Sequence, residues 1–175
     1  MNHTQLTYGQ IRLRPPEPED LGFLYLWEND PAIWKVSNTL VPFSRFILKK
    51  YIRESHRDLF DTRQLRLIIE DMTGKAVGAI DLFDFDPYHQ RAGLGILIYA
   101  TGDRRKGFAT DALRLMCEYA KNTLGLHQLY AHIGSDNPGS LSLFEKAGFQ
   151  IAGTKKEWLR TPDGWIDEMI IQKIL

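Results

Sequence analysis

The chain changes from strand to helix character within Leu97-Ile98-Tyr99-Ala100-Thr101-Gly102-Asp103-Arg104-Arg105-Lys106-Gly107-Phe108-Ala109-Thr110. The run 92–100 is almost wholly apolar or glycine, which predicts a central strand covered on both faces. After the quoted segment, apolar side chains recur at helical spacing until Gly125. A strand therefore passes into a helix through a basic loop that contains a glycine.

That loop has the chemistry of a phosphate site. A helix N-terminus leaves backbone N–H groups unpaired and carries partial positive charge. Gly107 lets the main chain approach a ligand, and Ala109 keeps the first helical turn narrow. Positive charge comes from Arg104, Arg105 and Lys106. The same pattern, taken alone, also occurs in ordinary solvated loops.

A second segment, 137–149, points to the same kind of site. It starts with Asn137-Pro138-Gly139-Ser140 and ends with Gly148-Phe149, which predicts a short helix closed by a glycine. The Asn137 side chain can accept a hydrogen bond from a loop amide, and the small residues Gly139 and Ser140 leave room for a ligand.

The remaining sequence predicts one mixed α/β (α+β) domain over 1–175, without a linker or an internal repeat. Helices are expected from near Glu19-Asp20 to a break at Asn29-Asp30-Pro31, and from an N-cap at Ser44 toward Ser55. Alternation and turn residues predict strands at 11–14, 64–70, 76–85, 128–133, 151–160 and 165–174.

The composition of the chain limits the kinds of partner that the protein is expected to bind. The chain has 22 Lys plus Arg and 22 Asp plus Glu, so no net charge favours nucleic acid or a membrane surface. The polar segment 1–10 has no signal-peptide core, and no stretch approaches the roughly 20 apolar residues that cross a bilayer; the expected compartment is the cytoplasm. Cys117 cannot form an internal disulfide, and its spacing to His127 and His132 predicts no metal site.

Segments 104–109 and 137–149 together resemble the cofactor motifs of the GNAT superfamily of N-acetyltransferases. The first matches Gln/Arg-x-x-Gly-x-Gly/Ala, and the second matches Asn-x-x-Ala/Ser before a helix that ends in Gly-Phe. The resemblance covers nearly the whole chain. Segments 27–31 and 42–45 look like the branch that contains spermidine acetyltransferases and ribosomal-protein N-terminal acetyltransferases.

This resemblance implies a splayed mixed sheet with acetyl-CoA between two parallel strands. The main-chain groups of Leu97, Ile98 and Tyr99 would pair with the pantetheine arm. The residues that would hold the pyrophosphate are Arg104, Arg105, Lys106, Gly107, Phe108, Ala109 and Thr110. Asn137 and Ser140 would lie beside the pantetheine, and Phe144 beside the thioester sulfur.

The chain departs from the family at Phe144, where many members have a tyrosine that protonates the leaving thiolate. A phenyl ring cannot donate a proton. The thiolate then leaves unaided, or Tyr99, Tyr130 or water supplies the proton.

Carboxylates are candidates for the general base that deprotonates the acceptor amine. Asp84 and Asp86 share a face at the period of two, and Asp81 points to the other face if the strand has no bulge there. Glu28 could attract a cationic amine. The alternative for Asp84 is a solvated strand end, and for Glu28 an exposed helix end.

The sequence thus predicts acetyl transfer to a primary amine of a small molecule, a polyamine being one such molecule, or of a protein N-terminus. The alternative is a non-catalytic acyl-CoA-binding module in which Phe144 marks the loss of chemistry. Family members are often dimers; the apolar run 169–171 fits either a homodimer contact or the inner face of the last strand.

Overall fold

Eight strands form one open sheet in the computed structural model, which describes residues 6–37 and 39–175. Along the sheet the strands follow the order β1-β2-β3-β4-β5-β6-β8-β7, and every neighbouring pair is antiparallel except the parallel pair β5 and β6. The strands are β1 (Thr7–Tyr8), β2 (Ile11–Arg14), β3 (Leu65–Asp71), β4 (Ala76–Asp86), β5 (Arg91–Ile98), β6 (Gln128–Gly134), β7 (Gln150–Thr161) and β8 (Gly164–Ile174). This is the mixed α/β architecture that the sequence predicts.

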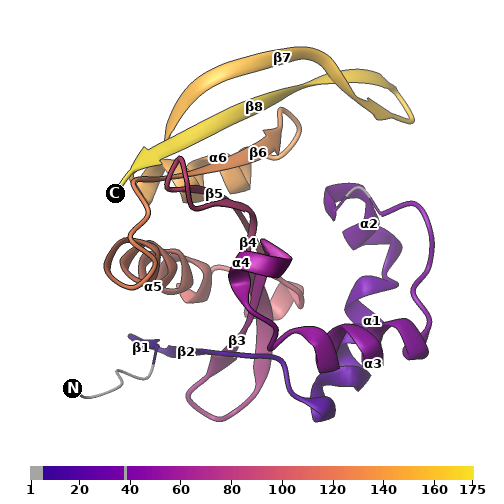
Figure 1. Ribbon diagram of the computed structural model, residues 1–175. Coiled ribbons are helices and arrows are strands. Elements are labelled where there is room, and N and C mark those ends of the chain that lie inside the picture. Colours follow the sequence, from indigo (N-terminus) through magenta and orange to yellow (C-terminus); the bar gives the residue numbers. More distant parts are fainter. Residues whose placement is uncertain (1–5, 38) are drawn as a thin grey trace.

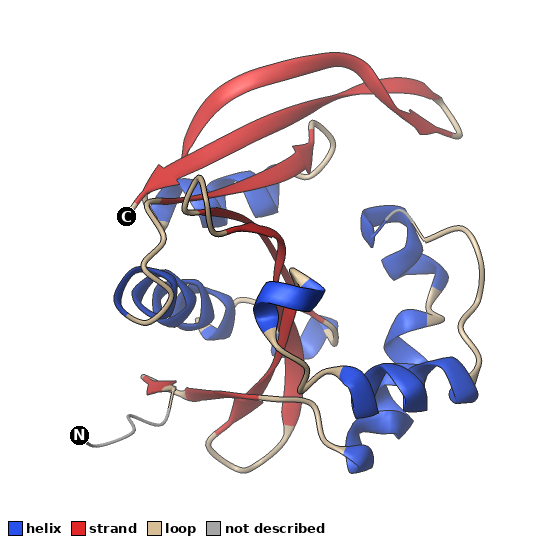
Figure 2. Cartoon of the chain, in the orientation of Figure 1, coloured by secondary structure: helices blue, strands red, loops and turns tan. Residues whose placement is uncertain are grey.

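Helices cover both faces of the sheet, as Figures 1 and 2 show. The helical segments are η1 (Pro18–Asp20), α1 (Leu21–Glu28), α2 (Pro31–Ser37), α3 (Arg45–Glu54), α4 (Leu59–Thr62), η2 (Thr101–Asp103), α5 (Phe108–Asn122) and α6 (Pro138–Lys146). The larger core lies under α5 and α6, where Met116 packs with Leu94. A second cluster, with Trp27 and Ile68, lies between the sheet and helices α1 and α3. Each fully buried aliphatic side chain of these cores stabilises the fold by about 1.5–3 kcal/mol.

The two parallel strands separate along their length. Within the described residues β5 and β6 pair at Arg91 with Gln128, Ala92 with Leu129 and Gly93 with Tyr130. Beyond Gly93 the strands diverge, so the second half of β5 has a strand neighbour on the β4 side alone. The sheet is therefore splayed at its centre, as the resemblance implied.

The prediction of a strand covered on both faces holds for only half of β5. Ala92, Gly93 and Leu94 are buried, but the residues from Gly95 onward are half-buried. The reason is the divergence from β6, which leaves this part of the strand beside an open space.

The short elements were not predicted. Asn29-Asp30-Pro31 ends α1 but does not lead into a loop: Pro31 begins α2, and the Asp30 carboxylate accepts the N–H of Ala32. Proline suits a first helical turn, where its missing N–H is not needed. Helix α4 and strand β1 are likewise too short to give a periodic pattern. Of the polar segment 1–10, residues 1–5 lie outside the described part of the chain.

Strand β4 contains a bulge that regular alternation does not anticipate. The β4–β5 register shifts between Phe83 and Asp86, and Asp84 has a positive φ of 49°. A bulge re-aims the side chains that follow it. The expectation of a regular strand through Asp84 is therefore wrong.

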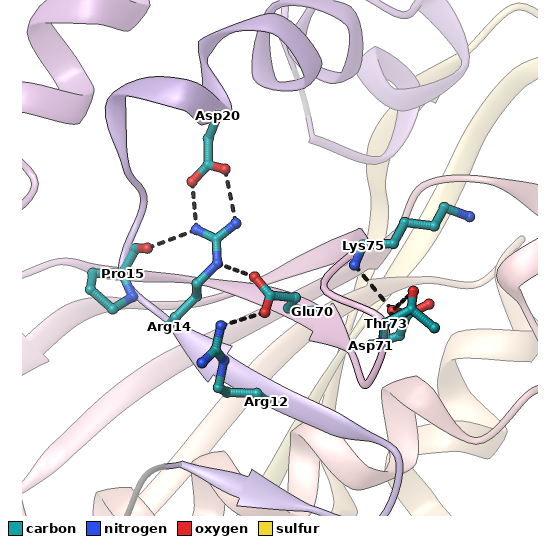
Figure 3. Close-up of polar contacts among 8 residues, drawn as sticks. All are labelled: Arg12, Arg14, Pro15, Asp20, Glu70, Asp71, Thr73 and Lys75. Atoms are coloured by element: carbon teal, nitrogen blue, oxygen red, sulfur yellow. Dashed lines mark hydrogen bonds and ion pairs between the residues drawn. The ribbon is translucent and has the colours of Figure 1, made fainter.

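An ion network ties the first strands to the first helices (Figure 3). Arg14 donates two hydrogen bonds to Asp20, at 2.7 and 2.9 Å, and a third to Glu70 on the neighbouring strand. Arg12 also bonds Glu70. The carboxylates are buried, so each arginine satisfies a charge that would otherwise be costly to bury.

The apolar run near the C-terminus alternates between the two faces of β8. Ile171 is buried, Met169 packs against the larger core, and Ile170 lines a small cavity. The inner-face interpretation therefore holds for Met169 and Ile171, and the homodimer contact stays a prediction.

Candidate functional site

A cleft of about 650 Å³ opens where β5 and β6 diverge. Strands β4, β5 and β6 supply its floor, α1 and α2 one wall, and the β7–β8 hairpin and the start of α6 the other. Figure 1 shows the far end of the hairpin above α2, both to the right of β5. The splay of the sheet thus creates the space.

The edge of β5 presents backbone groups to this cleft. The Tyr99 N–H donates to the Val77 carbonyl at 3.1 Å, so Tyr99 pairs with β4. In an antiparallel pair alternate residues turn their backbone groups to opposite sides, so Ile96 and Ile98 face the gap beside β6. Of the three residues predicted to pair with the pantetheine, Ile98 has this orientation, whereas the N–H of Tyr99 is already bonded and Leu97 faces β4.

Open amides mark the loop before α5. Among the described residues, no protein acceptor receives the backbone N–H of any residue in 105–110. Gly107 is the N-cap with a φ of 89°, and a Cβ built there would have no atom within 4 Å. Arg105 is also left-handed, with a φ of 62°. A row of unpaired amides at a helix start beside open space fits a diphosphate.

The three basic side chains of the loop have different partners. Arg104 donates to the carbonyls of Ile98 and Tyr99, at 3.2 and 3.3 Å, and so fastens the loop to the end of β5. Lys106 bonds Asp103, which also accepts from Lys75. Arg105 has no hydrogen-bond or ion-pair partner in the described part of the chain, and its side chain remains available for a phosphate.

The start of α6 forms part of the cleft wall. The Asn137 side-chain oxygen accepts the N–H of Ser140 at 3.1 Å and caps the helix. Both residues line the cleft, together with Phe144. The Phe144 ring is buried and packs edge-on against Phe149, with ring centroids 5.0 Å apart. The structure thus brings these three predicted residues together.

Glu28 lies in the cleft as part of an ion triad. Arg66 bonds both Glu28 and Asp81, and all three side chains line the cleft. Burial lowers the pKa of Arg66, but the two carboxylates outweigh it, and the pKa is raised well above its ordinary value. The triad carries one net negative charge on the acceptor side of the cleft.

The other two predicted catalytic residues are not among the residues that line this cleft. Asp84 lies with Asp86 in a separate cavity of about 460 Å³, because the bulge turns it there. Tyr99 stacks on Trp27, with ring centroids 5.4 Å apart. Burial raises the pKa of Tyr99, and a hydrogen bond with Asp30 adds to this. In the described part of the chain no tyrosine lines the cleft, and Tyr130 instead lines the smaller cavity with Asp84.

One group in the cleft escaped sequence reasoning. His132 on β6 lines the cleft, with its Nδ1 atom 3.6 Å from a carboxylate oxygen of Glu168 on β8. Glu168 also bonds Lys155 at 2.8 Å. Alternation along 128–133 could have placed His132 on the face opposite the core, but the sequence does not show that β8 pairs there.

No helix among the described residues is long and apolar enough to cross a membrane. Within the same residues, no group of three His, Cys, Asp or Glu side chains is placed to hold a metal ion.

The splayed parallel strands, the open amides before α5 and the capped start of α6 define an acyl-CoA-binding transferase. The chain belongs to the GNAT acetyltransferase family: residues 10–150 match the family described as acetyltransferase (GNAT) domain. It is therefore an acetyl-CoA-dependent N-acetyltransferase, as the sequence predicts.

The chain is also similar to individual acetyltransferases of known name. Spermidine N(1)-acetyltransferase of Escherichia coli (strain K12) is 27% identical over 143 residues, which cover 82% of this chain and 74% of the relative. L-methionine sulfoximine/L-methionine sulfone acetyltransferase of Pseudomonas aeruginosa is 29% identical over 119 residues, 65% of this chain and 69% of the relative. The crystal structure of spermidine N-acetyltransferase from Vibrio cholerae in complex with CoA and spermine has a TM-score of 0.84 and 26% identity, and covers 94% of this chain and 95% of that one.

Proposed function

We propose that the protein acetylates a primary amine of a polyamine, with spermidine or spermine as the acceptor. The observation that carries this proposal is the charge of the cleft. Four carboxylates line it, against one arginine and one lysine, although the whole chain has no net charge. The acidic residues are Glu28, Asp81, Asp136 and Glu168, and the basic ones are Arg66 and Lys155.

This charge favours a cationic acceptor. Opposite charges attract more strongly in a cleft with low-dielectric walls than in bulk water. The acids come from both sides of the cleft, Glu28 and Asp81 on one and Glu168 on the other, so an extended polycation could meet carboxylates on each wall. Spermidine acetyltransferases among the relatives agree with this substrate class.

For acetyl-CoA we assign the pyrophosphate to the amides of residues 105–110 with help from Arg105. Arg104 positions the loop through its bonds to the end of β5, and Lys106 helps to hold the loop through its bond to Asp103. The pantetheine arm follows the free edge of β5 at Ile96 and Ile98, and the thioester lies near Phe144 and the start of α6. Glu28 orients the acceptor through charge, because its carboxylate is already bonded to Arg66.

The test is thiol release from acetyl-CoA with a panel of amines at equal concentration. The panel contains spermidine, spermine, methionine sulfoximine and a peptide with a free N-terminus. We expect the polyamines to give the highest kcat/KM and to lose most of that advantage when salt is raised, since screening weakens charge attraction.

A higher kcat/KM for the zwitterionic methionine sulfoximine would contradict the polyamine assignment and leave the transferase assignment intact. CoA binding without turnover of any amine would instead support the binding-module alternative.

A further inference from the structure

We infer that His132 is the catalytic base that takes the proton from the acceptor amine, and that Glu168 positions its ring. This inference rests on the proposed function, because it needs a protonated amine in the cleft. It assigns a role to two residues outside the recognised cofactor motifs.

The strand places His132 in the cleft. Leu129, Ala131 and Ile133 on β6 are buried in the core, so the alternate residues Tyr130 and His132 face the other side of the sheet. His132 lies past the last β5–β6 pair, at Gly93 and Tyr130, where the strands have separated. Its ring therefore stands at the edge of the space that the diverging strands leave for an acyl group.

Glu168 lies beside the Nδ1 atom of His132, at ion-pair rather than hydrogen-bond distance. Gly134 pairs with Glu168 and His132 with Ile170 across β6 and β8, so the two side chains are diagonal neighbours on one face. The Nδ1 atom lies 3.6 Å from Glu168, whose side chain is only 9% exposed. We infer that this neighbour favours the tautomer with Nδ1–H toward the carboxylate, which would leave the Nε2 lone pair for the substrate.

The His132 ring has both charged and aromatic neighbours. Glu168 is bonded to Lys155 at 2.8 Å, so part of its charge is already balanced. On the same strand, the Tyr130 ring packs edge-on at a centroid distance of 5.5 Å. The remaining charged groups of the cleft are Glu28, Arg66, Asp81 and Asp136.

The other acidic groups are poorer bases. Glu28 and Asp81 both bond Arg66, so protonating either one would break an ion pair with an arginine whose side chain is only 19% exposed. Glu168 would lose its bond to Lys155 in the same way. Imidazole is the side-chain type that ordinarily exchanges a proton near neutral pH, which suits a base that must be regenerated at each turnover.

The protons and bonds balance as follows. The acceptor enters as R–NH3⁺ and gives one proton to Nε2 of His132. The neutral nitrogen forms a bond to the acetyl carbon and loses a second proton, while the carbon–sulfur bond breaks. One of these two protons ends on the thiolate and the other passes to water. The imidazole gives up its proton in this process and becomes neutral again.

The experiment uses His132→Gln and His132→Ala, with His127→Ala as the control, since the exposed His127 does not line the cleft. We expect His132→Gln to lower kcat for spermidine by about 10²-fold or more, with CoA affinity unchanged by calorimetry. The acid limb of the wild-type pH–rate profile should disappear, and added imidazole should restore part of the rate to His132→Ala. His127→Ala should behave as wild type in each measurement.

Glu168→Gln tests positioning. We expect kcat to fall less than in His132→Gln, with the pH–rate profile displaced rather than abolished. A wild-type kcat and pH profile in His132→Gln would overturn the inference while leaving amine acetylation in place. If the wild-type protein acetylates none of the amines, the proposed function itself has failed.

Discussion

Arg66 and Asp81 form a bidentate ion pair across β3 and β4, with Nε 2.7 Å from Oδ1 and Nη2 3.0 Å from Oδ2. A third guanidinium nitrogen bonds Glu28 on α1. The pair therefore connects the sheet to the first helix at the acceptor side of the cleft. It also means that one arginine holds two of the cleft's carboxylates in place.

The first prediction concerns the loss of this arginine. Arg66→Met would leave Glu28 and Asp81 close together without a counter-charge, at a cost of about 1.5–3 kcal/mol in the free energy of unfolding. Urea unfolding followed by circular dichroism measures the change. Arg53→Met, on the exposed face of α3, is the control and should cost little. If both variants unfold at the same urea concentration, the triad has no structural role.

A second prediction tests a close contact under the cleft. A Cβ added at Gly93 would lie 2.1 Å from a ring carbon of Phe83, whereas one at Gly95 would lie 3.9 Å from that ring. Gly93→Ala should therefore destabilise the fold by about 1–3 kcal/mol, and Gly95→Ala should cost less. Thermal unfolding of both variants makes the comparison.

The double variant Gly93→Ala/Phe83→Leu separates sterics from strand propensity. If the clash is the cause, the smaller side chain should recover part of the stability lost in Gly93→Ala. Purely additive losses would point to the glycine backbone instead.

Much of the fold was predictable because its signals are local. The residues that predict the glycine-containing loop, helix α5 and the turn at 161–164 are, in each case, neighbours in the sequence. The structure confirms these three elements. The motif residues Asn137, Ser140 and Phe144 likewise come together in the cleft, because one helix start carries them.

The parts that sequence reasoning missed depend on contacts between distant segments. Asp84 leaves the cleft because of a bulge, which alternation cannot reveal. Arg66 lies 38 residues from Glu28 in the chain, and no local pattern joins them. His132 gains its carboxylate partner only because β8 inserts between β6 and β7.

A third prediction concerns the phosphate loop. Gly107→Ala adds a Cβ at a φ of 89°, a conformation that costs a non-glycine residue about 1–2 kcal/mol. If the loop relaxes to avoid this cost, the amides of 105–110 turn away, and the dissociation constant for CoA should rise roughly tenfold. Calorimetric titration with CoA measures it. Gly102→Ala, which has open space and no positive φ, should bind CoA normally; equal affinity in both variants would argue against the loop.

The last prediction is a pH dependence of stability that arises at Glu70. Hydrogen bonds from Arg14, opposed by burial and assisted by Arg12, lower the pKa of Glu70 below its ordinary 4.5. A carboxyl whose folded pKa is depressed stabilises the fold above its unfolded pKa, and this contribution is lost as pH falls through the folded value. The free energy of unfolding should therefore decline below about pH 4.5, and Glu70→Gln should be less stable at pH 7 with a shallower decline on acidification. Urea unfolding from pH 7 to pH 3 measures both slopes, with the exposed Glu145→Gln as control. Hydrogen bonds from Lys75 to Asp103 and from Lys156 to Asp167 also lower the pKa of those carboxyls, so part of the acid sensitivity should survive in Glu70→Gln. A slope identical to wild type would place the titrating carboxylate outside the Arg14 network.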